Sequence, residues 1–171
     1  FGKNAYKTMK IGGIFVKGHF CITNNHAFRD GCDYYVVKIV QHSIVDGLNS
    51  NVTLELSSNV IVRDTQLDFC LFEVDNIPPM KDLLKFWIEK PIHIATLIML
   101  KRMKNGCMKK HIVHNAQLIH QFPVETLNIK LPIMLGKTIE PTAKGDCGSL
   151  AIAKTPVGVT ITGMHMLGYE D

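Results

Sequence analysis

The hydrophobic positions of the first half fall into short runs that alternate with polar residues and are separated by turn residues. Alternation with a period of two predicts strands that bury one face. The Lys17-Gly18 pair predicts a hairpin turn between the first two runs, and residues 24–30 predict a short turn of helix. About six strands are therefore expected before residue 76, over residues 11–16, 19–23, 34–40, 52–56, 60–63 and 68–74.

The strand pattern stops at Pro78 and Pro79, because two adjacent prolines do not fit inside a central strand. Leu83, Leu84 and Trp87 follow at helical spacing, so a helix is predicted over residues 80–90. Strand-like runs then resume. They predict six more strands, over residues 92–100, 110–121, 124–131, 134–138, 149–153 and 157–165.

Two sets of six short strands predict an all-β chain built from two six-stranded antiparallel β-barrels. The expected barrels are residues 1–76 and 91–171, joined by a linker over residues 77–90. Barrels of this size have no room for a substrate inside, so an active site is expected in the groove between them. The chain ends six residues after His165, so either the second barrel is truncated at its C-terminal end or the fold ends early.

Composition narrows the class of protein. With 171 residues, 46% hydrophobic and 20% charged, the chain is not a disordered one. No apolar stretch is long enough to span a bilayer, and the polar, basic start is not a signal peptide. The first residue is Phe1 rather than Met, which predicts that the chain was cut from something longer. Five cysteines without any sign of secretion predict reduced thiols.

Charge is distributed unevenly along the chain. The formal net charge is +4, yet residues 81–115 alone carry +6 and the remainder carries −2. A basic block of this kind favours contact with RNA or an acidic membrane, although a solvated loop region explains it as well.

The segment Gly145-Asp146-Cys147-Gly148-Ser149 places a cysteine in a tight turn just before an apolar strand. Glycines let the backbone fold sharply and expose the thiol, which a nucleophile needs. They also let successive backbone N–H groups of Gly145, Asp146 and Cys147 point together as an oxyanion hole. The alternative is a buried cysteine in an ordinary glycine turn.

A thiol nucleophile needs a base and, usually, an acid that orients the base. His26 is the best candidate base, because it lies where a strand-like run ends and a polar turn begins. Asp68 is the best candidate acid, because it opens an apolar run and must be paired or solvated there. Asp64, Glu73 and Asp75 are its rivals.

In this order and context, His26, Asp68 and the Gly-Asp-Cys-Gly motif resemble the chymotrypsin-fold cysteine proteases of picorna-like RNA viruses, the picornain family. The loose match to any single member suggests an insect-infecting virus. The resemblance implies a cysteine endopeptidase without a cofactor that is released from a viral polyprotein in the host cell cytoplasm. The resemblance also implies that this polyprotein is the substrate and that host proteins are further substrates. The implied reaction is acyl transfer through Cys147, His26 and Asp68.

A second motif extends the resemblance to substrate choice. Gly163-Met164-His165 matches the family's Gly-x-His, and Thr142 matches a threonine shortly before the nucleophile. In the family these groups bind the side-chain amide of a Gln at P1, the substrate residue before the cleaved bond. A neutral imidazole and a hydroxyl are suited to that amide. Some relatives hold the histidine with a tyrosine, and residues 137–141 contain none.

Two other functions compete with this reading. A zinc site would need paired ligands, and the spacing of Cys107, His111 and His114, or of His19 and Cys21, does not supply them, so no metal is expected. Viral RNA is a second expected partner, because residues 80–86 loosely resemble the family's RNA-binding linker, with Lys81 and Lys85 as phosphate contacts. The non-enzyme alternative is therefore an inactive, RNA-binding module with a protease fold.

Overall fold

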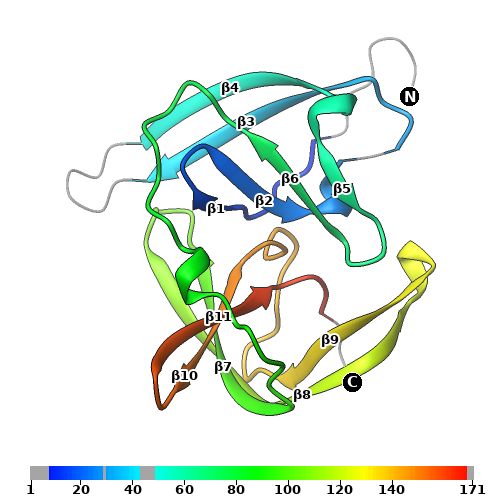
Figure 1. The fold of residues 1–171 in the computed structure, drawn as a ribbon, viewed down its shortest axis with the longest axis vertical. Helices are drawn as coiled ribbons and strands as arrows, with labels where there is room; N and C mark the ends of the chain where they lie inside the picture. Colours follow the sequence, from blue (N-terminus) through cyan, green and yellow to red (C-terminus); the bar gives the residue numbers. More distant parts are fainter. Residues whose placement is uncertain (1–7, 29, 43–48, 169–171) are drawn as a thin grey trace.

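The computed structural model describes residues 8–28, 30–42 and 49–168, so the extreme ends of the two predicted barrels, 1–7 and 169–171, lie outside the described residues. The described part contains eleven strands, four short 3-10 turns and no α-helix. Strands β1–β6 and strands β7–β11 form two bodies, one above the other in Figure 1. No helical segment in the described ranges has the length and apolar character needed to cross a bilayer. The chain is therefore mostly β, as the alternation predicts.

The first body is a four-stranded antiparallel sheet with a separate two-stranded hairpin. The sheet has the order β1-β2-β6-β5, and β3 pairs with β4. Tyr35, Val37 and Ile39 of the hairpin pack against a core that includes Cys70 and Phe72. The strands are β1 (Ile14–Lys17), β2 (Phe20–Asn24), β3 (Tyr34–His42), β4 (Asn49–Ser57), β5 (Val62–Asp64) and β6 (Phe69–Glu73).

The second body is a single five-stranded antiparallel sheet with the order β11-β10-β7-β8-β9. Its small buried core contains Leu97, Ala116 and Ala153, one from each of β7, β8 and β10. The strands are β7 (Ile94–Arg102), β8 (Met108–Val124), β9 (Ile129–Lys137), β10 (Leu150–Thr155) and β11 (Gly158–Met164).

Two closed six-stranded barrels are not confirmed. The three strands predicted over residues 110–121, 124–131 and 134–138 are two longer strands, β8 and β9. Pro123 does not end β8, because it pairs with Lys130 near the end of the ladder. The chain reverses instead at the 3-10 turn η4 (Glu125–Leu127), where Asn128 takes the left-handed conformation with φ 52°. Asn adopts that conformation more readily than most residues, so the turn forms there.

The predicted helix over residues 80–90 is wrong, although the two smaller turn predictions are confirmed. Only η3 (Leu84–Phe86) is helical, and a second 3-10 turn, η2 (Ser58–Val60), precedes β5. Backbone hydrogen bonds tie the connecting segment to both bodies, since Leu83 N–H donates to the carbonyl oxygen of Val16 and Ile88 N–H donates to that of Ile161. Residues 24–30 contain the expected short turn, η1 (Asn25–Ala27), and Gly18 turns the first hairpin with φ 55°.

Candidate active site

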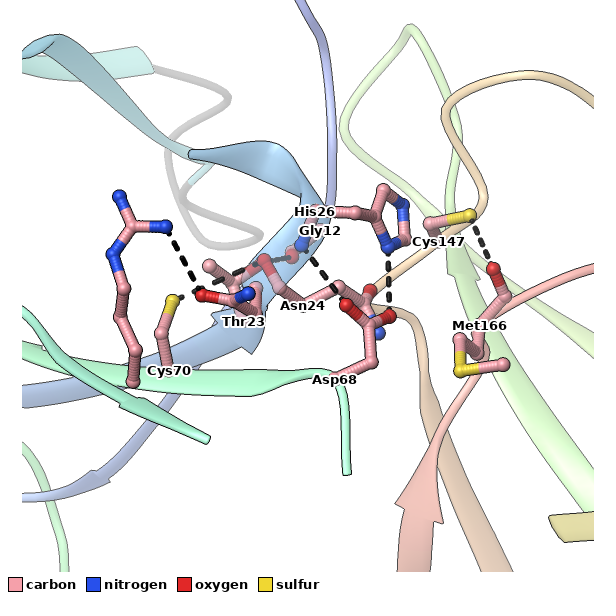
Figure 2. Close-up of polar contacts among 10 residues, drawn as sticks. Gly12, Thr23, Asn24, His26, Asp68, Cys70, Cys147 and Met166 are labelled. Atoms are coloured by element: carbon pink, nitrogen blue, oxygen red, sulfur yellow. Dashed lines mark hydrogen bonds and ion pairs between the residues drawn. The ribbon is translucent and has the colours of Figure 1, made fainter. Parts of the chain in front are cut away.

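Strand pairing brings two of the three predicted catalytic residues together. His26 lies in η1 directly after β2, and Asp68 lies directly before β6. Because Asn24 pairs with Phe69 across these neighbouring strands, the end of one meets the start of the other. Cys147 comes from the other body, in a turn that precedes β10, and Figure 2 shows it beside the imidazole of His26.

Three hydrogen bonds join the η1 turn to Asp68. The Nδ1 atom of His26 lies 2.7 Å from Oδ2 of Asp68, and the backbone N–H of His26 donates to Oδ1 at 2.9 Å. The backbone N–H of Asn25 donates to the carbonyl oxygen of Asp68 at 3.1 Å. Asp68 is 2% exposed and holds a left-handed backbone with φ 53°. Its carboxylate is thus fixed as an acceptor that keeps the Nδ1–H tautomer of His26.

The electrostatic consequence is a strongly basic imidazole. The hydrogen bond to Asp68, followed by the interaction with the neighbouring Cys147, raises the pKa of His26 from 6.5 to about 9, and burial opposes this only in part. The rival acids lie elsewhere: Asp64 accepts the backbone N–H groups of its own turn, and Glu73 and Asp75 are exposed. The structure therefore places Asp68, and none of those rivals, against His26.

Two glycines in left-handed conformations shape the Cys147 turn (residues 143–149). Gly145 has φ 98° and Gly148 has φ 81°. A Cβ atom on Gly148 would lie 1.9 Å from the carbonyl oxygen of Gly12, so only glycine fits there. The thiol of Cys147 is half-buried and donates to the carbonyl oxygen of Met166 at 3.0 Å (Figure 2). The turn therefore presents the sulfur at the surface between the two bodies.

The three N–H groups expected to form an oxyanion hole differ in their hydrogen bonds. The backbone N–H groups of Gly145 and Cys147 make no hydrogen bond to any residue that the structure describes. The expectation for Asp146 is wrong, because its N–H donates to the carbonyl oxygen of Ala143 at 3.1 Å. The turn closes on itself through that bond, so two donors rather than three remain for an oxyanion.

Two of the predicted P1 residues, Thr142 and His165, lie near Gly168. A Cβ atom on Gly168 would lie 2.0 Å from Oγ1 of Thr142 and 4.0 Å from Cε1 of His165, so Gly168 packs tightly against Thr142 and approaches His165. Burial lowers the pKa of His165 below its ordinary value, which favours a neutral imidazole. Gly163 pairs with Ala151 beside an irregularity in the β10–β11 ladder. A Cβ atom on Gly163 would meet no atom within 4 Å.

Two of the remaining cysteines are buried, and the candidate metal ligands are not grouped in the described part of the chain. Burial raises the pKa of the Cys21 thiol to about 12 and that of Cys70 to about 11, so both stay protonated. Within residues 8–28, 30–42 and 49–168, no three His, Cys, Asp or Glu side chains are grouped closely enough to hold a metal ion. His111 and His114 differ in environment, since the first is buried and the second is exposed.

The two lysines predicted to bind RNA lie on the connecting segment, away from the Cys147 turn in sequence. Lys81 and Lys85 are both exposed, and the ammonium of Lys85 lies 5.1 Å from the ring centre of Phe86. Phe86 itself is 43% exposed. RNA binding at this segment stays a prediction.

Sequence reasoning missed several residues around the site. A cavity of about 100 Å³ lies beside His26, and its walls come from the β8–β9 turn and from the segment after β11. The pattern gave no sign of this, because the reversal between β8 and β9 was misplaced and residues after His165 carry no motif. The cavity is lined by His26, Val124, Thr126, Leu127, Met166 and Leu167.

Comparison with known proteins identifies the fold. No protein-family model and no curated protein sequence matches the chain. The crystal structure of the NS6 protease from murine norovirus 1 aligns with a TM-score of 0.57 at 17% identity, covering 95% of this chain and 83% of its own. An inactive mutant of the murine norovirus protease, extended to include residues P1 prime to P4 prime of NS7, gives 0.55 at 17% identity over 94% and 86%.

A protease outside the norovirus group also matches. The inactive form of the mycobacterial Rv3671c protease aligns with a TM-score of 0.51 at 14% identity over 88% of this chain and 76% of its own. Likeness at this identity shows the fold. It does not show membership of the picornain family or an insect-infecting virus as the source. The chain has the fold of chymotrypsin-like proteases.

Proposed function

We propose that the protein is a cysteine endopeptidase that cleaves a viral polyprotein after Gln. The observation that carries this proposal is the position of His26, which is hydrogen-bonded to Asp68 through Nδ1 and lies beside the thiol of Cys147 (Figure 2). This order of acid, imidazole and thiol is what nucleophilic catalysis by cysteine needs. The protease fold of the chain supports the proposal. In this fold the three residues lie beside the ends of β2, β6 and β10.

The chemistry follows from the atoms in place. His26 takes the proton of the Cys147 thiol, and the sulfur attacks the carbonyl carbon of the scissile bond. The N–H groups of Gly145 and Cys147 stabilise the negative oxygen that forms. Protonated His26, whose charge Asp68 balances, then gives its proton to the leaving amine, and water hydrolyses the thioester with His26 as the base. In the free protein the thiol donates to the carbonyl oxygen of Met166, so this hydrogen bond has to break first.

Specificity for Gln rests on Thr142 and His165, which both lie near Gly168. A neutral imidazole can donate to the amide oxygen of Gln, and the Thr142 hydroxyl can pair with the same amide. A substrate without that amide leaves these groups unpaired, which disfavours it. Host proteins with a suitable Gln are further proposed substrates, and the host cell cytoplasm is the proposed place of cleavage.

The test is cleavage of peptides that differ only at P1, followed by mass spectrometry. We expect cleavage after Gln by the wild type and none by Cys147→Ala. Cys107→Ala is the matched control, because Cys107 is also a free cysteine but is exposed, so this variant should cleave normally. Equal cleavage by Cys147→Ala would refute the proposed nucleophile, whereas cleavage after another residue would refute the preference for Gln alone.

RNA binding is the second candidate function, and one observation favours it. Lys81, Lys85 and the aromatic ring of Phe86 are exposed together on the connecting segment. Lysines of this kind neutralise phosphates, and an exposed ring can stack on a base. The RNA-binding role would accompany proteolysis rather than replace it, because His26, Asp68 and Cys147 are all present.

A further inference from the structure

Lys101 and Asp146 form a partly buried ion pair directly behind the Cys147 turn. The Nζ atom of Lys101 lies 2.9 Å from Oδ2 of Asp146. The Asp146 side chain is 6% exposed and that of Lys101 is 19% exposed. Lys101 belongs to β7 in the second body, whereas Asp146 immediately precedes Cys147. A charge as buried as that of Asp146 is costly without a partner, and Lys101 provides one.

Asp146 connects to the turn at three further points. Its Oδ2 atom accepts the backbone N–H of Ala143 at 2.7 Å, and its own N–H donates to the Ala143 carbonyl. Its carbonyl oxygen accepts the N–H of Ser149 at 3.0 Å. One residue therefore ties both ends of the Cys147 turn, and Lys101 ties that residue to the sheet.

This arrangement decides which backbone N–H groups are available to a substrate. The N–H of Asp146 is directed to Ala143, while those of Gly145 and Cys147 have no acceptor among the described residues. Gly145 holds φ 98°, a conformation with low resistance to rotation in glycine. Groups outside the glycine must therefore hold the turn. The buried carboxylate of Asp146 is the side chain that does so, beside backbone hydrogen bonds such as that from Gly12 to Cys147.

We propose that Lys101 is a positioning residue that, through its ion pair with Asp146, holds the Cys147 turn so that the N–H groups of Gly145 and Cys147 meet the oxyanion. The proposal rests on the proposed function. It assigns Lys101 no contact with substrate. Removing the lysine leaves a buried carboxylate without its cation, and the turn can relieve that cost by rotating Asp146 toward water.

Lys101 also affects His165, and the experiment has to separate that effect. Burial lowers the pKa of His165, Asp146 raises it, and Lys101 lowers it. Loss of Lys101 would therefore favour a protonated His165 and change substrate binding at acidic pH. Measuring kcat and KM at alkaline pH keeps His165 neutral in every variant, so a change in kcat then reports the turn.

The test uses three variants of the full chain. Lys101→Met keeps the length of the side chain without its charge, and Lys101→Arg restores the charge. Lys109→Met is the matched control, because Lys109 lies opposite Lys101 in the β7–β8 register and pairs with the exposed Glu140 instead. We expect Lys101→Met to lower kcat about tenfold to hundredfold with KM nearly unchanged. This loss is smaller than the loss of kcat expected when an oxyanion-hole donor is removed completely. Lys101→Arg should recover most of the activity, and Lys109→Met should behave like the wild type.

Alkylation of Cys147 by iodoacetamide separates positioning from general damage. That reaction needs the thiol and His26 but no oxyanion donors, so its rate should be unchanged in Lys101→Met. Equal loss of alkylation and cleavage would contradict the proposal, as would a normal kcat in Lys101→Met or failure of Lys101→Arg to restore it.

Amide hydrogen exchange tests the same inference without proteolysis. In Lys101→Met, the N–H groups of Asp146 and Ser149 should exchange about tenfold faster than in the wild type, because local opening of the turn becomes easier. Unchanged exchange would overturn the positioning role of Lys101 even if the protein cleaves peptides. Faster exchange in a protein that cleaves nothing would support the role of Lys101 in the turn and refute the proposed function alone.

Discussion

The backbone N–H of Gly12 donates a 2.7 Å hydrogen bond to the carbonyl oxygen of Cys147. The carbonyl oxygen of the same glycine accepts the hydroxyl of Thr23 at 2.6 Å (Figure 2). Thr23 lies in β2, three residues before His26. Gly12 thus connects the strand that leads to the proposed base with the residue that carries the proposed nucleophile. We expect this clamp (Gly12, Thr23 and Cys147) to fix the distance between the two halves of the site.

Substitution of Thr23 by Val tests the clamp. Thr23 is 4% exposed, and the change leaves the Gly12 carbonyl without its hydroxyl partner. We expect the free energy of unfolding to fall by about 1–3 kcal/mol, together with slower peptide cleavage. Thr53→Val is the matched control, because Thr53 is an exposed strand residue in β4. Chemical denaturation and kcat measurements would contradict the clamp if the two variants behaved alike.

The close approach of Gly148 to Gly12 gives a second prediction. Gly148→Ala would place a methyl group 1.9 Å from the Gly12 carbonyl oxygen at a residue with φ 81°. Gly31 has nearly the same φ, 82°, but a Cβ there meets nothing within 4 Å. Gly31→Ala therefore measures the cost of the conformation alone, about 1–2 kcal/mol. We expect Gly148→Ala to be clearly less stable than that and to lose cleavage, as a thermal melt and a peptide assay would show. Similar melting temperatures for the two variants would argue against the tight contact.

The contact between Asp68 and His26 predicts a measurable titration. Asp68 is the largest cause of the raised pKa of His26, about 9. In Asp68→Asn the pKa of His26 should fall toward its ordinary 6.5, and NMR titration of the imidazole, assigned with His26→Gln, would detect the shift. A titration that does not move would show that Asp68 does not hold the imidazole.

Linkage gives the sign of the effect on stability. A group whose pKa is raised on folding stabilises the folded state fully below its unfolded pKa, and this contribution is lost as pH rises through the folded pKa. For His26 the loss falls between about pH 6.5 and 9. Denaturation across that range should therefore show a decline in stability that Asp68→Asn reduces.

The exposed group on the connecting segment predicts salt-dependent RNA binding. If Lys81 and Lys85 contact phosphates, affinity for structured RNA should fall steeply with salt and should weaken in Lys81→Glu/Lys85→Glu. Lys154→Glu on β10 is the control for a change of charge elsewhere, since Lys154 is exposed and distant in sequence. Filter binding that is insensitive to salt, or equal in the linker and control variants, would refute the RNA role.

The sequence predicted which candidate residues the structure brings together better than it predicted the fold around them. His26, Asp68 and Cys147 could be found because His26 follows a strand, Asp68 opens one, and Cys147 lies in a glycine motif before one. The β8–β9 turn was misplaced, because the prediction ended a strand at residue 121, whereas β8 continues and its Pro123 pairs with Lys130.

Long-range contacts explain the other failures. The helix predicted over residues 80–90 was wrong because backbone hydrogen bonds such as that from Leu83 to Val16 pair the segment with the two bodies, and helical spacing of apolar residues carries no information about them. Gly12 and Lys101 were missed for the same reason. Each acts on the Cys147 turn from a part of the chain that no local pattern connects to it.

The proposed contact of Thr142 with the P1 amide gives the sharpest prediction about specificity. Thr142→Val keeps the shape of the side chain and removes its hydroxyl, so one hydrogen bond to the P1 amide is lost. We expect kcat/KM for a Gln peptide to fall about tenfold, the equivalent of one hydrogen bond. A peptide with Met at P1 has no amide to lose, so its much slower cleavage should be unaffected. Thr160→Val on β11 provides the control, because the residue pairs within the β10–β11 ladder at Ala153. An equal fall for Gln and Met peptides would place the role of Thr142 in folding or in the turn rather than in recognition of the amide.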